Sequence, residues 1–90
     1  MTAEQKCNLR SIIEHYGHAH QQIKAIEEMA ELIQELSKFD GENLKKIIDE
    51  LADVEVMVEQ LKIIFDCHGE IEERINFKIN RQLERMSRGE

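Results

Sequence analysis

Residues 23–58 read IKAIEEMAELIQELSKFDGENLKKIIDELADVEVMV, and the predicted architecture follows from this segment. On both sides of its centre the apolar residues recur at intervals of three and four, which is the period of an α-helix. Phe39, Asp40 and Gly41 interrupt that period, and glycine supplies a turn conformation that other residues resist. The segment therefore predicts two helices joined by a tight turn.

The helical period extends over the rest of the chain. The 90 residues contain no proline, and the four glycines stand at positions 17, 41, 69 and 89. Thr2 and Gln5 have the spacing of a capping box, which marks the start of a helix. We expect helices over about residues 2–16, 18–38, 42–67 and 70–88, with breaks at Gly17 and Gly69. The predicted fold class is all-α, with four helices in one domain over residues 1–90.

Composition and charge exclude several classes of protein. With 41% hydrophobic and 34% charged residues, the chain has the balance of a globular domain. Nineteen acidic and twelve basic residues give a net charge of −7, which argues against broad binding to nucleic acids or anionic membranes. No apolar run is long enough to cross a membrane, and no secretory signal is expected. The two cysteines lie far apart in the sequence, so we expect no disulfide framework and a cytoplasmic location.

The third predicted helix has apolar residues on more sides than one neighbouring helix can cover. Its main stripe consists of Leu44, Ile47, Ile48, Leu51, Val54, Val58, Leu61 and Phe65, with Ala52, Val56 and Ile63 in a second row and Met57 and Ile64 in a third. The second helix carries Ile23, Ile26, Met29, Ala30, Ile33 and Leu36 on one side. Because so small a domain buries little of its own surface, we expect it to oligomerise into a helical bundle, as a homodimer or a dimer-of-dimers tetramer. The alternative is a monomeric bundle with an exposed apolar groove.

Acidic residues are concentrated on the two central helices. Glu27, Glu28 and Glu31 lie on the second helix, and Glu50 and Asp53 lie on the third. Residues three or four apart on a helix project side by side, so each group consists of neighbouring carboxylates. If the two helices pack antiparallel through the central turn, the two groups face each other. Carboxylates alone favour Mg²⁺ or Mn²⁺ over zinc or a di-iron centre, and the alternative is a solvated acidic face.

The fourth predicted helix supplies a positive counterpart. Its basic residues are spaced at intervals of four, three, four and three, which places them along one face of the helix. They are Arg74, Lys78, Arg81, Arg85 and Arg88, and they lie beside the apolar row Ile75, Ile79 and Met86. Such a row can bind phosphates, or it can pair with the acidic face of a neighbouring helix. We expect the inner members Lys78, Arg81 and Arg85 to bind phosphate and the outer two to be solvated.

Together these motifs resemble the MazG-like nucleotide pyrophosphohydrolases, which belong to the all-α NTP pyrophosphatase superfamily. The core of the resemblance is Glu27-Glu28-x-x-Glu31, followed on the next helix by Glu50-x-x-Asp53. The similarity extends over residues 16–86 and also includes Tyr16-Gly17, Gln21, the runs 27–36 and 50–54, and Lys78 with Arg85.

The resemblance implies Mg²⁺-dependent hydrolysis of a nucleoside triphosphate between its α and β phosphates, giving the monophosphate and pyrophosphate and so cleansing the nucleotide pool. It implies that Glu28, Glu31, Glu50 and Asp53 bind the metal, that Glu27 orients a ligand or the attacking water, and that Lys78, Arg81 and Arg85 hold the phosphate chain. Gln21 and Tyr16 are candidates for contacts with the base, and the alternative for each is an ordinary core or capping role. Similar proteins form dimers or tetramers. Two other functions stay open, a non-catalytic helical adaptor and an inactive nucleotide-sensing oligomer.

Overall fold

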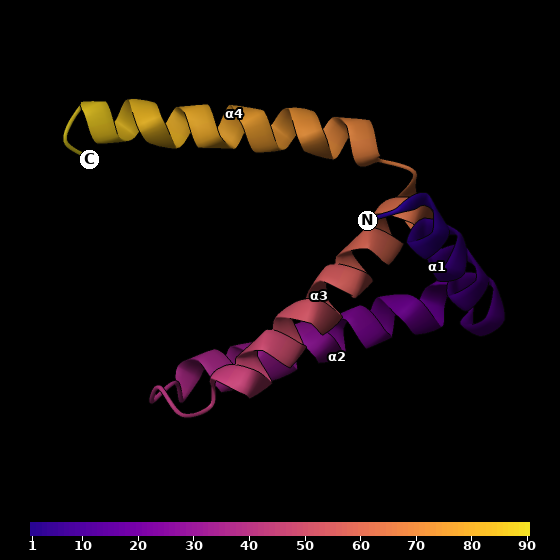
Figure 1. The fold of residues 1–90 in the computed structure, drawn as a ribbon. Coiled ribbons are helices and arrows are strands. Elements are labelled where there is room, and N and C mark those ends of the chain that lie inside the picture. Colours follow the sequence, from indigo (N-terminus) through magenta and orange to yellow (C-terminus); the bar gives the residue numbers. More distant parts are fainter.

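The computed structural model describes all residues from 1 to 90 and contains four helices and no strands. In chain order the helices are α1 (Ala3–Tyr16), α2 (His18–Ser37), α3 (Leu44–Phe65) and α4 (His68–Ser87). Helices α2 and α3 form an antiparallel hairpin, α1 packs against it, and α4 extends away from the other three (Figure 1). The predicted all-α class with four helices is confirmed. None of the four combines the length and apolar character needed to span a membrane.

Local sequence sets the bounds of α1 as predicted. The hydroxyl of Thr2 accepts a hydrogen bond from the Gln5 backbone N–H at 3.0 Å, and the Thr2 N–H donates to Gln5 Oε1 at 2.9 Å, which completes the capping box. Gly17 follows the last residue of the helix with φ +91°, a region that residues with a side chain rarely adopt. Its N–H donates to the carbonyl of Ile13 at 2.7 Å, and the chain turns directly into α2.

The connection between α2 and α3 fixes how the two helices align. Gly41 has φ +89°, and Asp40 Oδ1 accepts a hydrogen bond from the Glu42 N–H at 2.8 Å. Across the turn, the side-chain amide of Asn43 donates to the carbonyl oxygen of Glu35 at 3.1 Å and to its carboxylate at 3.0 Å. This contact ties the end of α2 to the start of α3, and it sets the register in which their acidic residues meet.

The buried face of the hairpin differs from the predicted apolar stripes. The structure buries Gln21, Ala25 and Glu28 of α2 and Ile47, Met57 and Gln60 of α3, together with Leu9 and Ile13 of α1. Many members of the predicted stripes are exposed in the single chain, among them Ile23, Ile26, Ile33, Leu36, Leu44, Ile48, Leu51 and Phe65. The contact between α2 and α3 does not cover these residues, so their burial would depend on the predicted oligomer. Because α3 is apolar on several sides, hydrophobicity alone does not select the side that meets α2.

The break before α4 comes earlier than predicted. Asp66 adopts the left-handed conformation with φ +50°, which aspartate tolerates better than most residues. The N–H groups of Asp66 and Cys67 donate to the carbonyls of Ile63 and Lys62, which closes the last turn of α3. Gly69 therefore lies inside the first turn of α4 and does not separate the helices.

One side-chain hydrogen bond joins the start of α4 to α3. The Nε2 atom of His68 lies 2.7 Å from Glu59 Oε1, and it donates to that carboxylate. This hydrogen bond holds the pKa of Glu59 below its usual range, although burial of the carboxylate opposes the shift. The contact fixes the direction in which α4 leaves α3.

We expect Glu59→Gln to lower the free energy of unfolding by about 1 kcal/mol at neutral pH, because the charge-assisted hydrogen bond is lost. A carboxylate whose pKa is lowered by folding stabilises the fold above its unfolded pKa, and it loses this effect as the pH falls through the lowered value. The difference between wild type and variant should therefore vanish at acidic pH, as measured by urea unfolding over a pH series. Glu72→Gln, at an exposed position of α4, is the matched control. A difference independent of pH would contradict the assignment.

The isolated chain leaves a large surface exposed. Its accessible surface is 6998 Å², whereas a compact protein of this mass has about 5,500 Å². Its radius of gyration is 16.0 Å, against about 12 Å for a compact domain of this length. Only eight residues are buried, none of them on α4. The chain alone therefore forms a thin core between α1, α2 and α3.

Candidate metal centre

Four carboxylates of the hairpin converge between α2 and α3. Glu28 and Glu31 are one helical turn apart on α2, and Glu50 and Asp53 are one turn apart on α3. Carboxylate oxygens of Glu28, Glu31 and Glu50 lie within 4.8 Å of one another. Asp53, the fourth predicted ligand, is not part of this group of three, although burial and then the charge of Glu28 raise its pKa. The antiparallel hairpin thus brings the two predicted acidic groups together.

The cluster is partly buried, and two of its carboxylate oxygens have no hydrogen-bond donor. Glu28 is only 8% exposed, and its Oε2 atom is buried with no hydrogen-bond partner. The Oε2 atom of Glu50 is buried and unpartnered in the same way. A buried carboxylate oxygen without a donor is unfavourable, and a bound cation offsets this cost. Two such atoms in one all-oxygen cluster fit a hard divalent cation better than a solvated acidic face.

Burial and mutual repulsion raise the pKa values of two members of the cluster. Burial is the main cause of the raised pKa of Glu50, and the charges of Glu31, Asp53 and Glu28 raise it further. The pKa of Asp53 is raised by burial and then by the neighbouring Glu28 carboxylate. The fully ionised cluster is therefore unfavourable by itself, and a positive charge among these carboxylates would stabilise it.

One cation of the chain contacts the edge of the cluster. Lys24 Nζ lies 3.2 Å from Glu28 Oε1 and 3.7 Å from Glu27 Oε2. The hydrogen bond to Glu28 is the main reason why the pKa of Lys24 is raised. A single lysine does not neutralise four carboxylates, and the second oxygen of Glu28 still has no partner.

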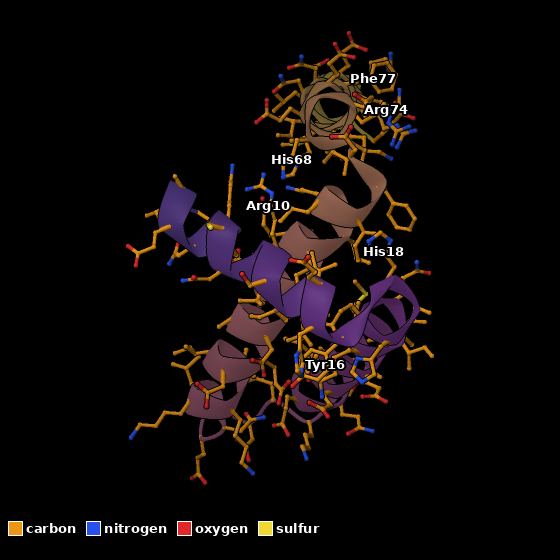
Figure 2. The ribbon with its side chains drawn as sticks, turned by 90° about the vertical axis from the view of Figure 1, so that its right-hand side faces the viewer. Arg10, Tyr16, His18, His68, Arg74 and Phe77 are labelled. Atoms are coloured by element: carbon orange, nitrogen blue, oxygen red, sulfur yellow. The ribbon has the colours of Figure 1, made fainter.

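Glu27, the fifth predicted acid, lies beside the cluster at the rim of a cavity. Its side chain is 58% exposed. The cavity has a volume of about 370 Å³ and is lined by Tyr16, His20, Gln21, Lys24, Glu27 and Met57. The ring of Tyr16, at the end of α1 (Figure 2), stacks on the ring of His20 in α2 with the centroids 4.9 Å apart. Because Lys24 touches both Glu27 and Glu28, the cavity adjoins the carboxylate cluster.

Gln21 is buried and already hydrogen-bonded, in contrast to its predicted contact with substrate. Its amide nitrogen donates to Gln60 Oε1 at 2.7 Å, and its oxygen lies 2.7 Å from His20 Nδ1. Gln60 in turn donates to the sulfur of Met57 at 3.5 Å. Gln21 therefore joins α2 to α3 and positions His20. Gln60 was not among the predicted site residues, because the burial of a glutamine cannot be recognised from the spacing of apolar residues.

The structure does not bring Lys78, Arg81 and Arg85 to the carboxylates of their own chain. All three lie on α4, which diverges from the hairpin (Figure 1), and none of them forms an ion pair. Arg81 instead faces the ring of Phe77 with its guanidinium carbon 5.8 Å from the centroid, and Arg74 does so at 4.6 Å (Figure 2). Within one chain, the predicted phosphate-binding row and the predicted metal ligands are separate.

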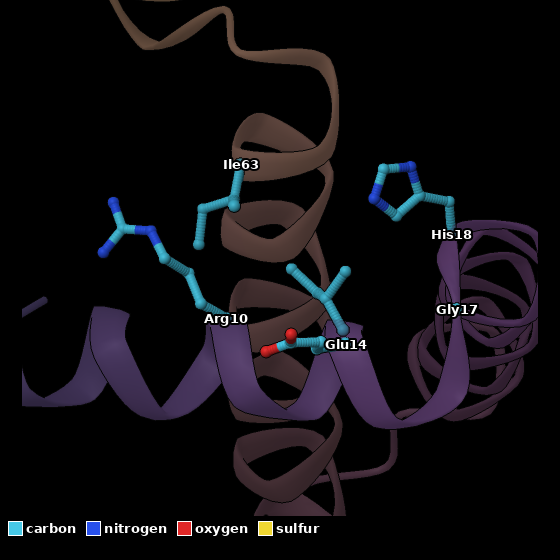
Figure 3. A pocket seen from close by; sticks show the side chains of 6 residues that line it. Arg10, Glu14, Gly17, His18 and Ile63 are labelled. Carbon is cyan, nitrogen blue, oxygen red and sulfur yellow. The ribbon is translucent and has the colours of Figure 1, made fainter.

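A second cavity, of about 400 Å³, is lined by Arg10, Ile13, Glu14, Gly17, His18 and Ile63 (Figure 3). It contains a single carboxylate, that of Glu14, and so offers no comparable set of oxygen ligands. The carboxylate cluster between α2 and α3 is therefore the stronger candidate for a functional site. Compared with known proteins, the chain matches no family model, no curated protein and no solved structure.

Proposed function

We propose that this protein hydrolyses nucleoside triphosphates between the α and β phosphates, giving monophosphate and pyrophosphate in a reaction that requires Mg²⁺ or Mn²⁺. The observation that carries the proposal is the meeting of Glu28, Glu31 and Glu50, with two buried carboxylate oxygens that no donor satisfies. A hard divalent cation bound by such a set keeps positions open for phosphate oxygens. The resemblance of the double acidic motif to MazG-like pyrophosphohydrolases supports a nucleotide as the substrate.

The residues in and around the cluster would have different roles in this reaction. Glu28, Glu31, Glu50 and Asp53 would hold the metal ion, which when bound offsets the negative charge of the phosphates. Glu27 is exposed beside them and orients the attacking water. The stacked rings of Tyr16 and His20 give the adjoining cavity an aromatic wall suited to a nucleobase.

We further propose that the protein acts as a homo-oligomer, a dimer or a dimer of dimers. Its accessible surface of 6998 Å² exceeds that of a compact monomer by about 1,500 Å², which is more than the roughly 800 Å² that each partner buries in a typical stable interface. Both cysteines are free, which is compatible with the reducing cytoplasm that we expect as its location.

Product analysis tests the proposed reaction. The full-length protein is incubated with a panel of canonical and damaged nucleoside triphosphates, with Mg²⁺ or with a chelator, and the products are separated by chromatography. We expect monophosphate and pyrophosphate in equal amounts from at least one nucleotide, and no products with the chelator. The preferred nucleotide identifies the base and sugar selectivity.

Two other outcomes would overturn the proposal. Diphosphate and orthophosphate as products would indicate a different phosphatase. No turnover by a folded protein would favour the nucleotide-sensing oligomer if calorimetry detects binding of Mn²⁺ and nucleotide. It would favour the helical adaptor if neither binds.

A further inference from the structure

Helix α4 has an apolar stripe that nothing in its own chain covers. The stripe consists of Ile75, Ile79, Leu83 and Met86, which are 46–60% exposed. At 100° per residue these side chains share one arc of the helix; Lys78 and Arg85 lie about 60–80° outside one edge of that arc, whereas Arg81 lies on the opposite face of the helix. A surface helix of this pattern ordinarily packs its apolar arc on a partner. The basic residues beside the arc are then carried to the rim of that contact.

The C-terminal part of α4 and the hairpin carry complementary charges, whereas the first turns of α4 carry Glu70, Glu72 and Glu73. Residues 74–88 contain five basic residues and one acidic residue. The carboxylate cluster of Glu28, Glu31, Glu50 and Asp53 is met within the chain by one lysine, and its buried oxygens remain unpartnered. Each chain therefore has an unneutralised acidic site on the hairpin and a basic row on α4 in which only Arg88 forms an ion pair, with Glu90. Because the two are far apart in one chain, each can be completed only from outside it.

A second copy of this chain would supply both a basic row for the acidic site and an apolar surface for α4. The hairpin exposes apolar side chains outside its packed face, including Ile26, Ile33, Ile48 and Leu51, and these can receive the stripe of α4. The exposed surface exceeds that of a compact monomer by about 1,500 Å², enough for a stable interface on each copy. In a twofold pair the contact is made twice, so neither α4 is left without a partner.

We propose that α4 of each copy packs its apolar stripe on the α2–α3 hairpin of a second copy and places Lys78 and Arg85 beside that copy's carboxylate cluster. Each site is then built from two chains, with carboxylates from one and cationic side chains from the other. The ligand that fits between them is a polyphosphate carrying a divalent cation. The role of these basic residues in phosphate binding rests on the proposed function. The pairing of the two chains does not depend on that function.

Zero-length cross-linking tests the pairing without any assay of activity. Isotopically heavy and light full-length chains are refolded together and treated with a carbodiimide, which joins an amine to a carboxylate in contact. We expect Lys78 to link to Glu27, Glu31, Glu50 or Asp53 in products that combine a heavy and a light chain. The Lys24–Glu28 pair, at 3.2 Å in one chain, is the internal control, and Lys78→Arg should remove only the links from position 78. Lys78 links confined to one chain, or absent while Lys24–Glu28 forms, would overturn the proposal.

Mixed oligomers test whether the pairing builds the site. Asp53→Asn and Arg85→Ala should each be inactive alone. In an equimolar mixture, half of the dimers are mixed and one of their two sites is intact, so about a quarter of wild-type activity should return. If the carboxylates and bases of one site come from the same chain, no activity returns. A wild-type protein without hydrolysis would refute the proposed function alone, and the cross-links would still decide the pairing.

Discussion

Glu28→Gln is expected to abolish binding of Mg²⁺ or Mn²⁺ and to reduce nucleotide hydrolysis by about 100-fold or more. Glu28 is the most buried of the clustered carboxylates, and its Oε2 atom has no partner in the protein. Gln has nearly the same shape, but it offers one neutral oxygen where two charged ones stood. Calorimetry with Mn²⁺ and chromatography of the nucleotide products measure the two losses.

The stability of the same variant without metal distinguishes a binding site from a structural cluster. Loss of the ion pair with the half-exposed Lys24 costs little, and relief of repulsion with Glu50 and Asp53 opposes this cost. We therefore expect thermal unfolding in chelator to be nearly unchanged or shifted to higher temperature. Glu14→Gln, on α1 and away from the cluster, should leave metal binding and hydrolysis intact. A marked loss of metal-free stability, with normal Mn²⁺ binding, would assign Glu28 to the fold instead.

The candidate metal centre was largely predictable from the sequence because it depends on local rules. Helical spacing places Glu28 beside Glu31 and Glu50 beside Asp53, and a short turn around Gly41 brings the two helices together antiparallel. No distant contact has to be known for these carboxylates to meet. The bounds of α1 were predictable for the same reason, since Thr2 and Gln5 form a capping box within four residues.

The packing was less predictable because several sides of α3 are similarly apolar, and hydrophobicity does not determine which side packs against α2. Met57 faces α2 while Leu51 on the same helix is exposed, although both are large and apolar. The side chains of Gln21 and Gln60 are hydrogen-bonded to each other inside the hairpin. Their burial could not be predicted from the pattern of apolar residues, because both side chains are polar. The course of α4 depends on the left-handed Asp66 and on the His68–Glu59 contact, neither of which the spacing of apolar residues reveals.

Ile79→Glu is expected to dissociate the oligomer and to leave the chain largely unfolded at low protein concentration. In the chain alone Ile79 is 55% exposed, so a substitution there would change the free energy of unfolding by no more than about 0.5 kcal/mol. In the proposed pair the side chain is buried against the neighbouring hairpin, and an unpaired carboxylate in such a contact costs several kcal/mol, roughly the net stability of a small domain. The single chain and the proposed pair therefore predict different effects of Ile79→Glu on the free energy of unfolding.

Sedimentation equilibrium and thermal unfolding over a range of concentrations measure the difference. When folding and association are coupled, the wild-type unfolding temperature rises with protein concentration, and Ile79→Glu should lower it at every concentration. Asn80→Glu introduces the same charge on the same helix outside the apolar stripe, and it should keep the wild-type mass and stability. A wild-type monomer whose unfolding temperature does not depend on concentration, and an Ile79→Glu variant equal to it, would exclude the paired arrangement. The thin core of eight buried residues favours the paired arrangement, because one chain alone removes so little apolar surface from water.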